Sequence, residues 1–467
     1  MMLGLFVGSA NRMTLSTGIV CMVNSTAFKT AENNEKNETR SCNRYDEDSE
    51  EMPVQGDLMW SPPEVALMLS SSFYGSCATT LFSGALADYF GATRVLTVAL
   101  STSAFLTVLV PLLARVSYGA LMGSRVLIGM GESLLIPAIN CMATYWFPKS
   151  EKSTLASLYT SGFQLAAAIG SLLSAELCRS AAGWPSIFYT FGSIAAVFTV
   201  VFTIFASETP AHSRWTSVKE KAFLAATIPD VGKKPSLLNS PWKAILTSPP
   251  LHSIMLCSFA FGYSSATLMA YLPMYLKEHL SLPVRTIGQY TLATFVSQIV
   301  AKNVCGPLCD YVARRELVSL NVATKVAQSL GSFGGAICLV ILAFAPSCEH
   351  PEYALYVLIC FGVGSAGAVN GFYTSVLTIA PRYTGTVSSV SMIFSMMAAV
   401  SSSVIVTSLT SLNSPHKWLL VFGSASLFQL ICGLHFLFYG STDIVEWSKE
   451  EPSKSREFTE KNNNDKA

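Results

Sequence analysis

The sequence predicts an all-α, polytopic membrane protein with twelve transmembrane helices in two pseudo-symmetric six-helix bundles. Long apolar segments, a scarcity of charge and a motif that occurs once in each half support this prediction. Of the 467 residues, 51% are hydrophobic and 13% are charged, which is about half the charged fraction of an average soluble domain. The net charge of +1 provides no basic surface for nucleic acid.

Twelve apolar segments have the length of about 20 residues that crosses the hydrocarbon core as a helix. The first is the weakest because Asn11 and Arg12 interrupt it, and a signal peptide is the alternative. We favour a helix because no basic leader precedes the apolar run. The expected spans are 1–23, 65–87, 95–114, 119–142, 155–177, 184–206, 251–276, 286–309, 323–345, 354–377, 384–410 and 418–439.

Polar segments between these spans define the expected domains. An acidic loop covers 24–63, a linker with several Lys and Pro residues covers 207–250, and a charged tail covers 441–467. We therefore expect an N-terminal bundle at 1–206, a C-terminal bundle at 251–440, and a disordered tail.

Lys and Arg are more frequent in the segments on the side of the linker and the tail. The positive-inside rule places this side, with both termini, in the cytosol. The sequons Asn24-Ser-Thr and Asn37-Glu-Thr lie in the opposite, first loop, where glycan transfer occurs. The sequence leaves open whether the membrane is the plasma membrane or that of a vesicle or lysosome, and we expect a monomer.

The cysteines and the short motifs argue against other classes of protein. Most of the 12 cysteines lie inside apolar segments, so we expect no disulfide framework. Cys305 and Cys309 are interpreted as small helix residues and not as metal ligands. No G-x-S-x-G, H-E-x-x-H or G-x-x-x-x-G-K-[ST] motif occurs. We expect no enzyme activity, no catalytic residues, no cofactor and no bound metal.

The motif G-x-L-x-D-Y ends the second span at 84–89 and recurs at the end of the eighth span at 306–311. Such internal symmetry is typical of transporters built from two related halves. Glycine allows close helix packing, and the Asp can pair with an Arg or face the N-terminus of a neighbouring helix. We expect a conformational latch, with a simple capped turn as the alternative. The expected latch residues are Gly84, Asp88, Gly91, Arg94, Gly306 and Asp310.

The first copy, extended to G-x-L-x-D-x-x-G-x-x-R, resembles the motif between the second and third helices of the major facilitator superfamily. Arg125-Val-Leu-Ile-Gly129 and Gly183-Trp-Pro-Ser-Ile-Phe188 resemble its anion transporter family, which includes sialin, the sodium/phosphate cotransporters and the vesicular glutamate transporters. The resemblance implies a secondary active carrier of organic anions or inorganic phosphate, coupled to H⁺ or Na⁺, that works by alternating access. A transport-inactive sensor that kept the fold is the alternative.

Arg12, Arg125 and Glu132 lie inside apolar spans, where a charge costs about 2.5–3.5 kcal/mol and usually faces a cavity or a partner. Arg can form two parallel hydrogen bonds to a carboxylate or phosphate. The resemblance associates both arginines with binding of a small anionic solute and Glu132 with proton coupling; a fixed salt bridge is the alternative. Lys302 and Lys325 lie toward the cytosolic helix ends, where they are expected to snorkel, with anion recognition as the alternative.

Three positions depart from the family pattern. Asn140 stands where many members have His, and Thr378 stands where an Asp is common. Phe261 occupies a position that is Arg in the vesicular glutamate transporters. Phe261 disfavours glutamate as the substrate and leaves the C-terminal half poor in anion-binding charge, while the missing His and Asp keep the sensor alternative open.

Overall fold

The computed structural model describes residues 1–23, 56–228, 242–347, 349–410 and 416–448. Within these ranges the chain is helical, and one isolated bridge between Val23 and Leu58 is the single β-type pairing. The N-terminal long helices are α1 (Met2–Met22), α2 (Pro62–Phe90), α3 (Ala92–Val116), α4 (Tyr118–Trp146), α5 (Lys152–Arg179) and α6 (Pro185–Phe205).

The C-terminal long helices follow two short ones, α7 (Val218–Thr227) and α8 (Trp242–Leu246). They are α9 (Pro249–Leu280), α10 (Val284–Arg314), α11 (Leu320–Phe344), α12 (Glu352–Ala368) with its continuation α13 (Thr374–Thr378), α14 (Thr384–Thr410) and α15 (Lys417–Tyr439).

Eleven helices in the described part of the chain are long and apolar enough to cross a membrane. The 21-residue α1 is a further long helix at the first predicted span. Each predicted span therefore coincides with a helix, and most helices extend past the span, because a helix continues beyond the hydrocarbon core. The all-α, membrane-spanning fold class is confirmed.

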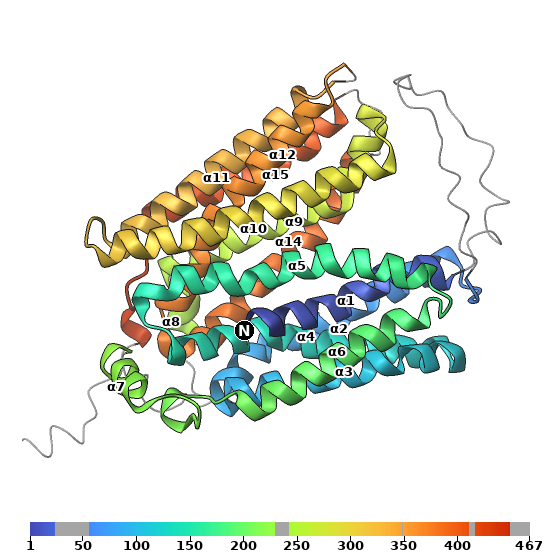
Figure 1. Cartoon of the computed structure of the whole chain (residues 1–467). Helices are drawn as coiled ribbons and strands as arrows, with labels where there is room; N and C mark the ends of the chain where they lie inside the picture. Colours follow the sequence, from blue (N-terminus) through green and yellow to red (C-terminus); the bar gives the residue numbers. More distant parts are fainter. Residues whose placement is uncertain (24–55, 229–241, 348, 411–415, 449–467) are drawn as a thin grey trace, which may run out of the picture.

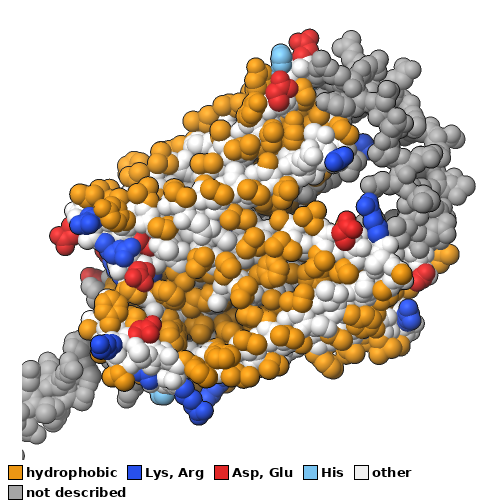
Figure 2. Space-filling view, viewed as in Figure 1, with side chains coloured by type: hydrophobic (Ala, Val, Ile, Leu, Met, Phe, Trp, Pro, Cys, Tyr) orange, Lys and Arg blue, Asp and Glu red, His pale blue; other side chains and the backbone are white. Residues whose placement is uncertain are grey.

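The long helices form two groups, α1–α6 and α9–α15, which diverge toward one end (Figure 1). The short helices α7 and α8 lie at the opposite end, which we call the linker end. Figure 2 shows hydrophobic side chains over the flank of the molecule, while charged side chains gather at its two ends. The same view shows the surface hollowed between the halves at the end away from α7, which we call the open end.

A π-helical turn, Val369–Tyr373, joins α12 to α13. Asn370 on this turn accepts a hydrogen bond from the Ser157 hydroxyl of α5 at 2.7 Å. The Phe372 N–H donates to the Gln328 side chain of α11 at 3.0 Å. Because π-turns are frequent at functional sites, this turn marks the contact between the halves as a region of interest.

The first residues of the predicted tail are placed against the linker end. The Val445 N–H donates to the Ile379 carbonyl at 2.9 Å, and the Trp447 ring lies 5.9 Å from the Tyr383 ring. Residues 441–448 thus extend the described structure beyond the predicted boundary at 440. Residues 449–467 lie outside the described ranges.

A disulfide bond between Cys21 and Cys178 joins the end of α1 to the end of α5. The sequence did not predict this bond, because both cysteines sit at the ends of apolar segments. The signal was available, since both positions lie on the same predicted side of the membrane. The disulfide lies within one half, so it constrains that half and not the relation between the halves.

We predict that Cys21→Ser and Cys178→Ser each lower the stability of the protein by about 2 kcal/mol or more. The double variant should lose no more than either single variant, because the two changes remove the same bond. Thermal unfolding in detergent measures the effect, with the exposed free Cys77 changed to Ser as the control. Losses that add in the double variant would contradict a shared bond.

Candidate functional site

Arg12 and Glu132 form an ion pair between α1 and α4. Arg12 Nη1 lies 3.2 Å from Glu132 Oε1, and the side chains are 39% and 13% exposed. The Arg12 guanidinium carbon also lies 4.6 Å from the centroid of the Phe73 ring on α2, within cation–π range. Three helices thus hold a guanidinium group that is partly open to the exterior.

Arg125 lies beneath this pair and is only 1% exposed. Its Nη2 donates to the Arg12 main-chain carbonyl at 3.2 Å. Its Nε and Nη1, and the Glu132 Oε2, are buried and have no hydrogen-bond partner in the structure. A buried donor without a partner costs about 1–3 kcal/mol, so this cluster is incomplete as it stands.

The structure therefore brings the three predicted residues together, but with unequal access. Arg12 is the exposed member and Arg125 is covered. The predicted alternative of a salt bridge is present for Arg12 and Glu132, while Arg125 has no carboxylate within ion-pair distance in the described chain. Among the described residues, the cluster thus offers two guanidinium nitrogens and one carboxylate oxygen that have no hydrogen-bond partner.

Asp88 at the end of α2 binds the N-terminus of α14 in the other half. Its carboxylate accepts hydrogen bonds from the Gly385 N–H at 3.0 Å and the Thr386 N–H at 2.9 Å. The Thr386 hydroxyl donates a third bond at 2.9 Å. A helix N-terminus favours a carboxylate because its N–H groups are unpaired and its dipole is positive there.

Asp310 at the end of α10 makes the equivalent contact in the opposite direction. Its carboxylate accepts from the Ser153 N–H at 3.3 Å and the Thr154 N–H at 2.7 Å, at the N-terminus of α5. Of the two partners that the sequence allowed for each Asp, the structure selects the helix N-terminus. Each carboxylate thus binds a helix of the other half, and both contacts lie at the linker end.

The two motif glycines allow the helices to come this close. A Cβ at Gly84 would clash with the main chain of Gly385 on α14, and a Cβ at Gly306 would clash with Ser153 and Ser157 on α5. Each Gly therefore lies in the same contact as the Asp that follows it in its motif.

The remaining two latch residues lie apart from the contact between the halves. Gly91 has φ of +94° at the turn before α3, and a Cβ there would overlap the Glu208 carboxylate. Arg94 is exposed and forms no ion pair with Asp88 within the described residues. Gly91 thus supplies the positive φ of the turn between α2 and α3.

Polar side chains extend the contact between the halves. Asn140, one of the departures from the family pattern, donates to the Ser388 hydroxyl of α14 at 2.8 Å and accepts from the Tyr159 hydroxyl at 2.7 Å. The buried Lys152 donates to the Leu377 carbonyl. Thr378 bonds only within its own helix turn, to the Thr374 and Ser375 carbonyls.

Lys302 is placed differently from the prediction. It does not snorkel: its side chain is fully buried, and Nζ donates to Thr160 Oγ1 at 3.1 Å and Gln164 Oε1 at 2.7 Å on α5. The burial of Lys302 was not predicted because the expected span ended at residue 309. The helix α10 extends to Arg314, which places Lys302 about three turns before its end. Lys325, by contrast, reaches the Phe438 carbonyl at 3.5 Å in an exposed position.

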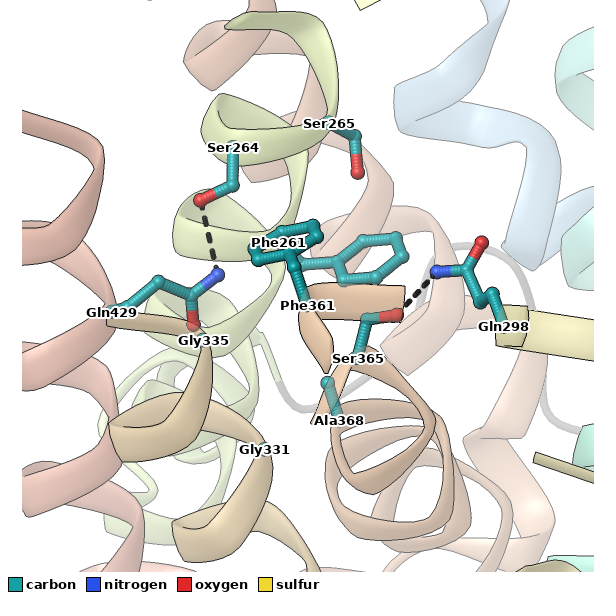
Figure 3. A pocket seen from close by; sticks show the side chains of 10 residues that line it. All are labelled: Phe261, Ser264, Ser265, Gln298, Gly331, Gly335, Phe361, Ser365, Ala368 and Gln429. Carbon is teal, nitrogen blue, oxygen red and sulfur yellow. Dashed lines mark hydrogen bonds between the residues drawn. The ribbon is translucent and has the colours of Figure 1, made fainter. Parts of the chain in front are cut away.

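A small cavity of about 20 Å³ lies inside the C-terminal half (Figure 3). Gln298 donates to Ser365 on one side of it and Gln429 donates to Ser264 on the other, at 2.7 and 3.0 Å. Phe261, the third departure from the family pattern, is one of its lining residues. The cavity has the size of one water molecule and does not adjoin the Arg12 cluster.

The glycosylation residues Asn24 and Asn37 lie outside the described ranges. No group of three or more His, Cys, Asp or Glu side chains that could hold a metal ion occurs among the residues that are described.

Comparison with known proteins identifies the fold and its family. The family model described as Major Facilitator Superfamily matches residues 1–404. The chain belongs to this superfamily. A solved structure of the proton:xylose symporter XylE superposes on this facilitator with a TM-score of 0.67 at 15% identity, and the match covers 95% of both chains.

Two relatives place this facilitator in the anion and phosphate cotransporter family, as the sequence motifs predicted. It is 32% identical to the "Uncharacterized transporter slc-17.3" of Caenorhabditis elegans, over 98% of this chain and 90% of the relative. It is 28% identical to a "Putative inorganic phosphate cotransporter" of Drosophila melanogaster, over 97% and 86%. The chain is therefore a multi-pass membrane transporter and not an enzyme, and the comparisons do not favour a transport-inactive sensor.

We predict that Asp88→Asn combined with Asp310→Asn loosens the linker end. Each change removes a charged acceptor, and a hydrogen bond to a charged group contributes about 1.5–3 kcal/mol. A Ser388→Cys reporter, in a chain without its other free cysteines, should react at least about ten times faster with a water-soluble maleimide.

The matched control is Asp443→Asn, which removes an exposed ion pair with Lys149 at the same end. An exposed pair contributes about 0–1 kcal/mol, so labelling should not change. Equal labelling of the wild type and the double variant would show that the two buried carboxylates do not hold this end closed.

Proposed function

We propose that this facilitator carries a small anion, either inorganic phosphate or an organic anion, by alternating access and in coupling with H⁺ or Na⁺. The observation that carries the proposal is the Arg12–Arg125–Glu132 cluster. It brings two arginines of neighbouring helices together inside the helix bundle, and among the described residues Glu132 is the one carboxylate that pairs with either of them.

The cluster suits an anion in its unused bonding capacity. Among the described residues, Nε and Nη1 of Arg125 have no acceptor, and Arg12 is 39% exposed. Carboxylate and phosphate oxygens accept strong hydrogen bonds from guanidinium groups. In this proposal Arg12 meets the anion first, and Arg125 binds it once the Arg12–Glu132 pair rearranges.

The printed names of the relatives support an anionic substrate and ion coupling. The fly relative is a putative inorganic phosphate cotransporter. A mouse relative, 29% identical over 95% of this chain and 93% of its own length, is named "Sodium-dependent phosphate transport protein 3". These names leave the choice between H⁺ and Na⁺ open.

Glu132 is the proposed coupling residue. One of its oxygens pairs with Arg12, and the other is buried without a partner. Protonation would remove the charge that holds Arg12, and this would free the guanidinium for the anion. Binding of a proton and of an anion would thereby favour each other.

The proposed orientation places the linker end in the cytosol. Disulfides persist on the oxidising, extracellular or luminal side, and Cys21–Cys178 ties the helix ends that lead away from the linker end. The excess of Lys and Arg at the linker side points the same way. The structure would then correspond to a conformation that opens outward.

We predict that Arg125→Ala lowers saturable uptake of labelled phosphate or a labelled carboxylate at least tenfold, because the anion loses a charged hydrogen-bond donor inside the bundle. Uptake is measured in proteoliposomes with imposed proton and sodium gradients in separate runs. Arg115→Ala, an exposed arginine at the end of α3, is the control. Unchanged uptake would reject Arg125 as a substrate contact.

We predict that Glu132→Gln makes transport independent of pH, because Gln imitates the protonated carboxyl and cannot release a proton. The measurement is the initial uptake rate between about pH 5 and 8, because the pH dependence of a rate reports the essential acids and bases. Glu176→Gln, an exposed carboxylate of α5, should keep the wild-type profile. A retained profile in Glu132→Gln would leave that residue as a structural partner of Arg12.

A further inference from the structure

Lys302 is a fully buried ammonium group held by neutral side chains of the opposite half. It belongs to α10, whereas its acceptors Thr160 and Gln164 belong to α5. In the described part of the chain no Asp or Glu oxygen lies within 4 Å of its Nζ. A buried charge normally has a counter-charge or pays a large desolvation cost, so Lys302 lacks a partner of opposite sign.

Its position along the bundle can be derived from the packing of α1 on α5. Gly162, between the two acceptors in sequence, lies against the main chain of Met2 and Phe6. Arg12 follows Phe6 by six residues in α1, which places it about 9 Å closer to the open end. Lys302 therefore forms a second cationic layer, between the Arg12 cluster and the linker end.

A chain of hydrogen bonds connects this layer to the cavity of the C-terminal half. Gln164, besides accepting from Lys302, donates to Gln298 Oε1 at 2.9 Å. Gln298 in turn donates to the Ser365 hydroxyl at the cavity wall (Figure 3). The contact is thus a network that joins both halves, and separation of the halves would break it at Gln164.

We propose that Lys302 is a second anion-binding group, which the C-terminal half contributes when the halves separate at the linker end. This inference rests on the proposed function. When α5 and α10 part, Lys302 loses Thr160 and Gln164 as acceptors and gains water. A small anion that descends from the Arg12 cluster, or enters from the cytosol, then supplies the acceptor oxygens and the missing negative charge.

The chemistry of an ammonium fits this role. Lys is a compact point charge that binds carboxylate or phosphate without the planar geometry of Arg. The same group is shielded by α5 in the present conformation, so that the two cationic layers are open to solute in different conformations. The anion is then bound by the N-terminal half in the conformation that is open at the open end. It is bound by the C-terminal half in the conformation that is open at the linker end.

The test is the KM for labelled inorganic phosphate, measured separately in right-side-out and inside-out membrane vesicles that contain the full chain. Lys302→Gln should raise the KM at the linker side at least about tenfold, with less than a twofold change at the open side. Lys302→Arg should restore the KM. Lys325→Gln, a lysine of the adjacent α11 at the same end, should leave both values unchanged.

A second variant covers the case in which Lys302→Gln does not fold. Gln164→Glu places a permanent carboxylate at the acceptor 2.7 Å from Lys302, so it should compete with phosphate and raise the same KM. Equal KM changes on both sides, or no change in either variant, would overturn the role of Lys302. Absence of saturable phosphate flux in the wild type would instead reject the proposed function for this anion, and the inference with it.

Discussion

Two carboxylates cap helices of the opposite half at the linker end of this transporter. Asp88 accepts three hydrogen bonds at the start of α14, and Asp310 accepts two at the start of α5. Both lie in contacts from which bulk water is excluded, where an ionised carboxylate is tolerated only if donors replace its hydration. The N–H groups at a helix start are such donors and need no counter-cation. Because the contact uses main-chain atoms, it depends on how closely the helices approach, which explains the glycines beside each Asp.

The positive charges inside the bundle are compensated less completely than these carboxylates. Arg12 is compensated by Glu132, whereas Arg125 and Lys302 are compensated only by neutral oxygens. A protein that needed only stability would gain by replacing these groups with apolar side chains. Their retention in two layers, one on α1 and α4 and one on α10, is consistent with a solute that brings its own negative charge and moves between them.

The helical fold and the repeat could be predicted from the sequence because both depend on local pattern. Span length identified the helices, and the two G-x-L-x-D-Y copies located Asp88 and Asp310. The partners of these residues could not be predicted, since Gly385 and Thr386 lie almost 300 residues from Asp88 and carry no charge that would reveal them. The burial of Lys302 was missed for a related reason: hydropathy does not tell how far a helix extends or which side of it faces the other half. The Cys21–Cys178 disulfide could not be predicted for the same reason, because it joins helix ends that are 157 residues apart in the sequence.

The π-helical turn at Val369–Tyr373 has a mechanical consequence. A π-turn accommodates one more residue than an α-turn, so every side chain after it is rotated by about 100° relative to an uninterrupted α-helix. This rotation directs Thr374 toward the Ser153 hydroxyl of α5, at 3.2 Å, while Gly367 stays packed on α11. The same membrane span thus packs on α11 before the π-turn and on α5 after it. One extra residue in the helix therefore lets a single span make polar contacts with both halves.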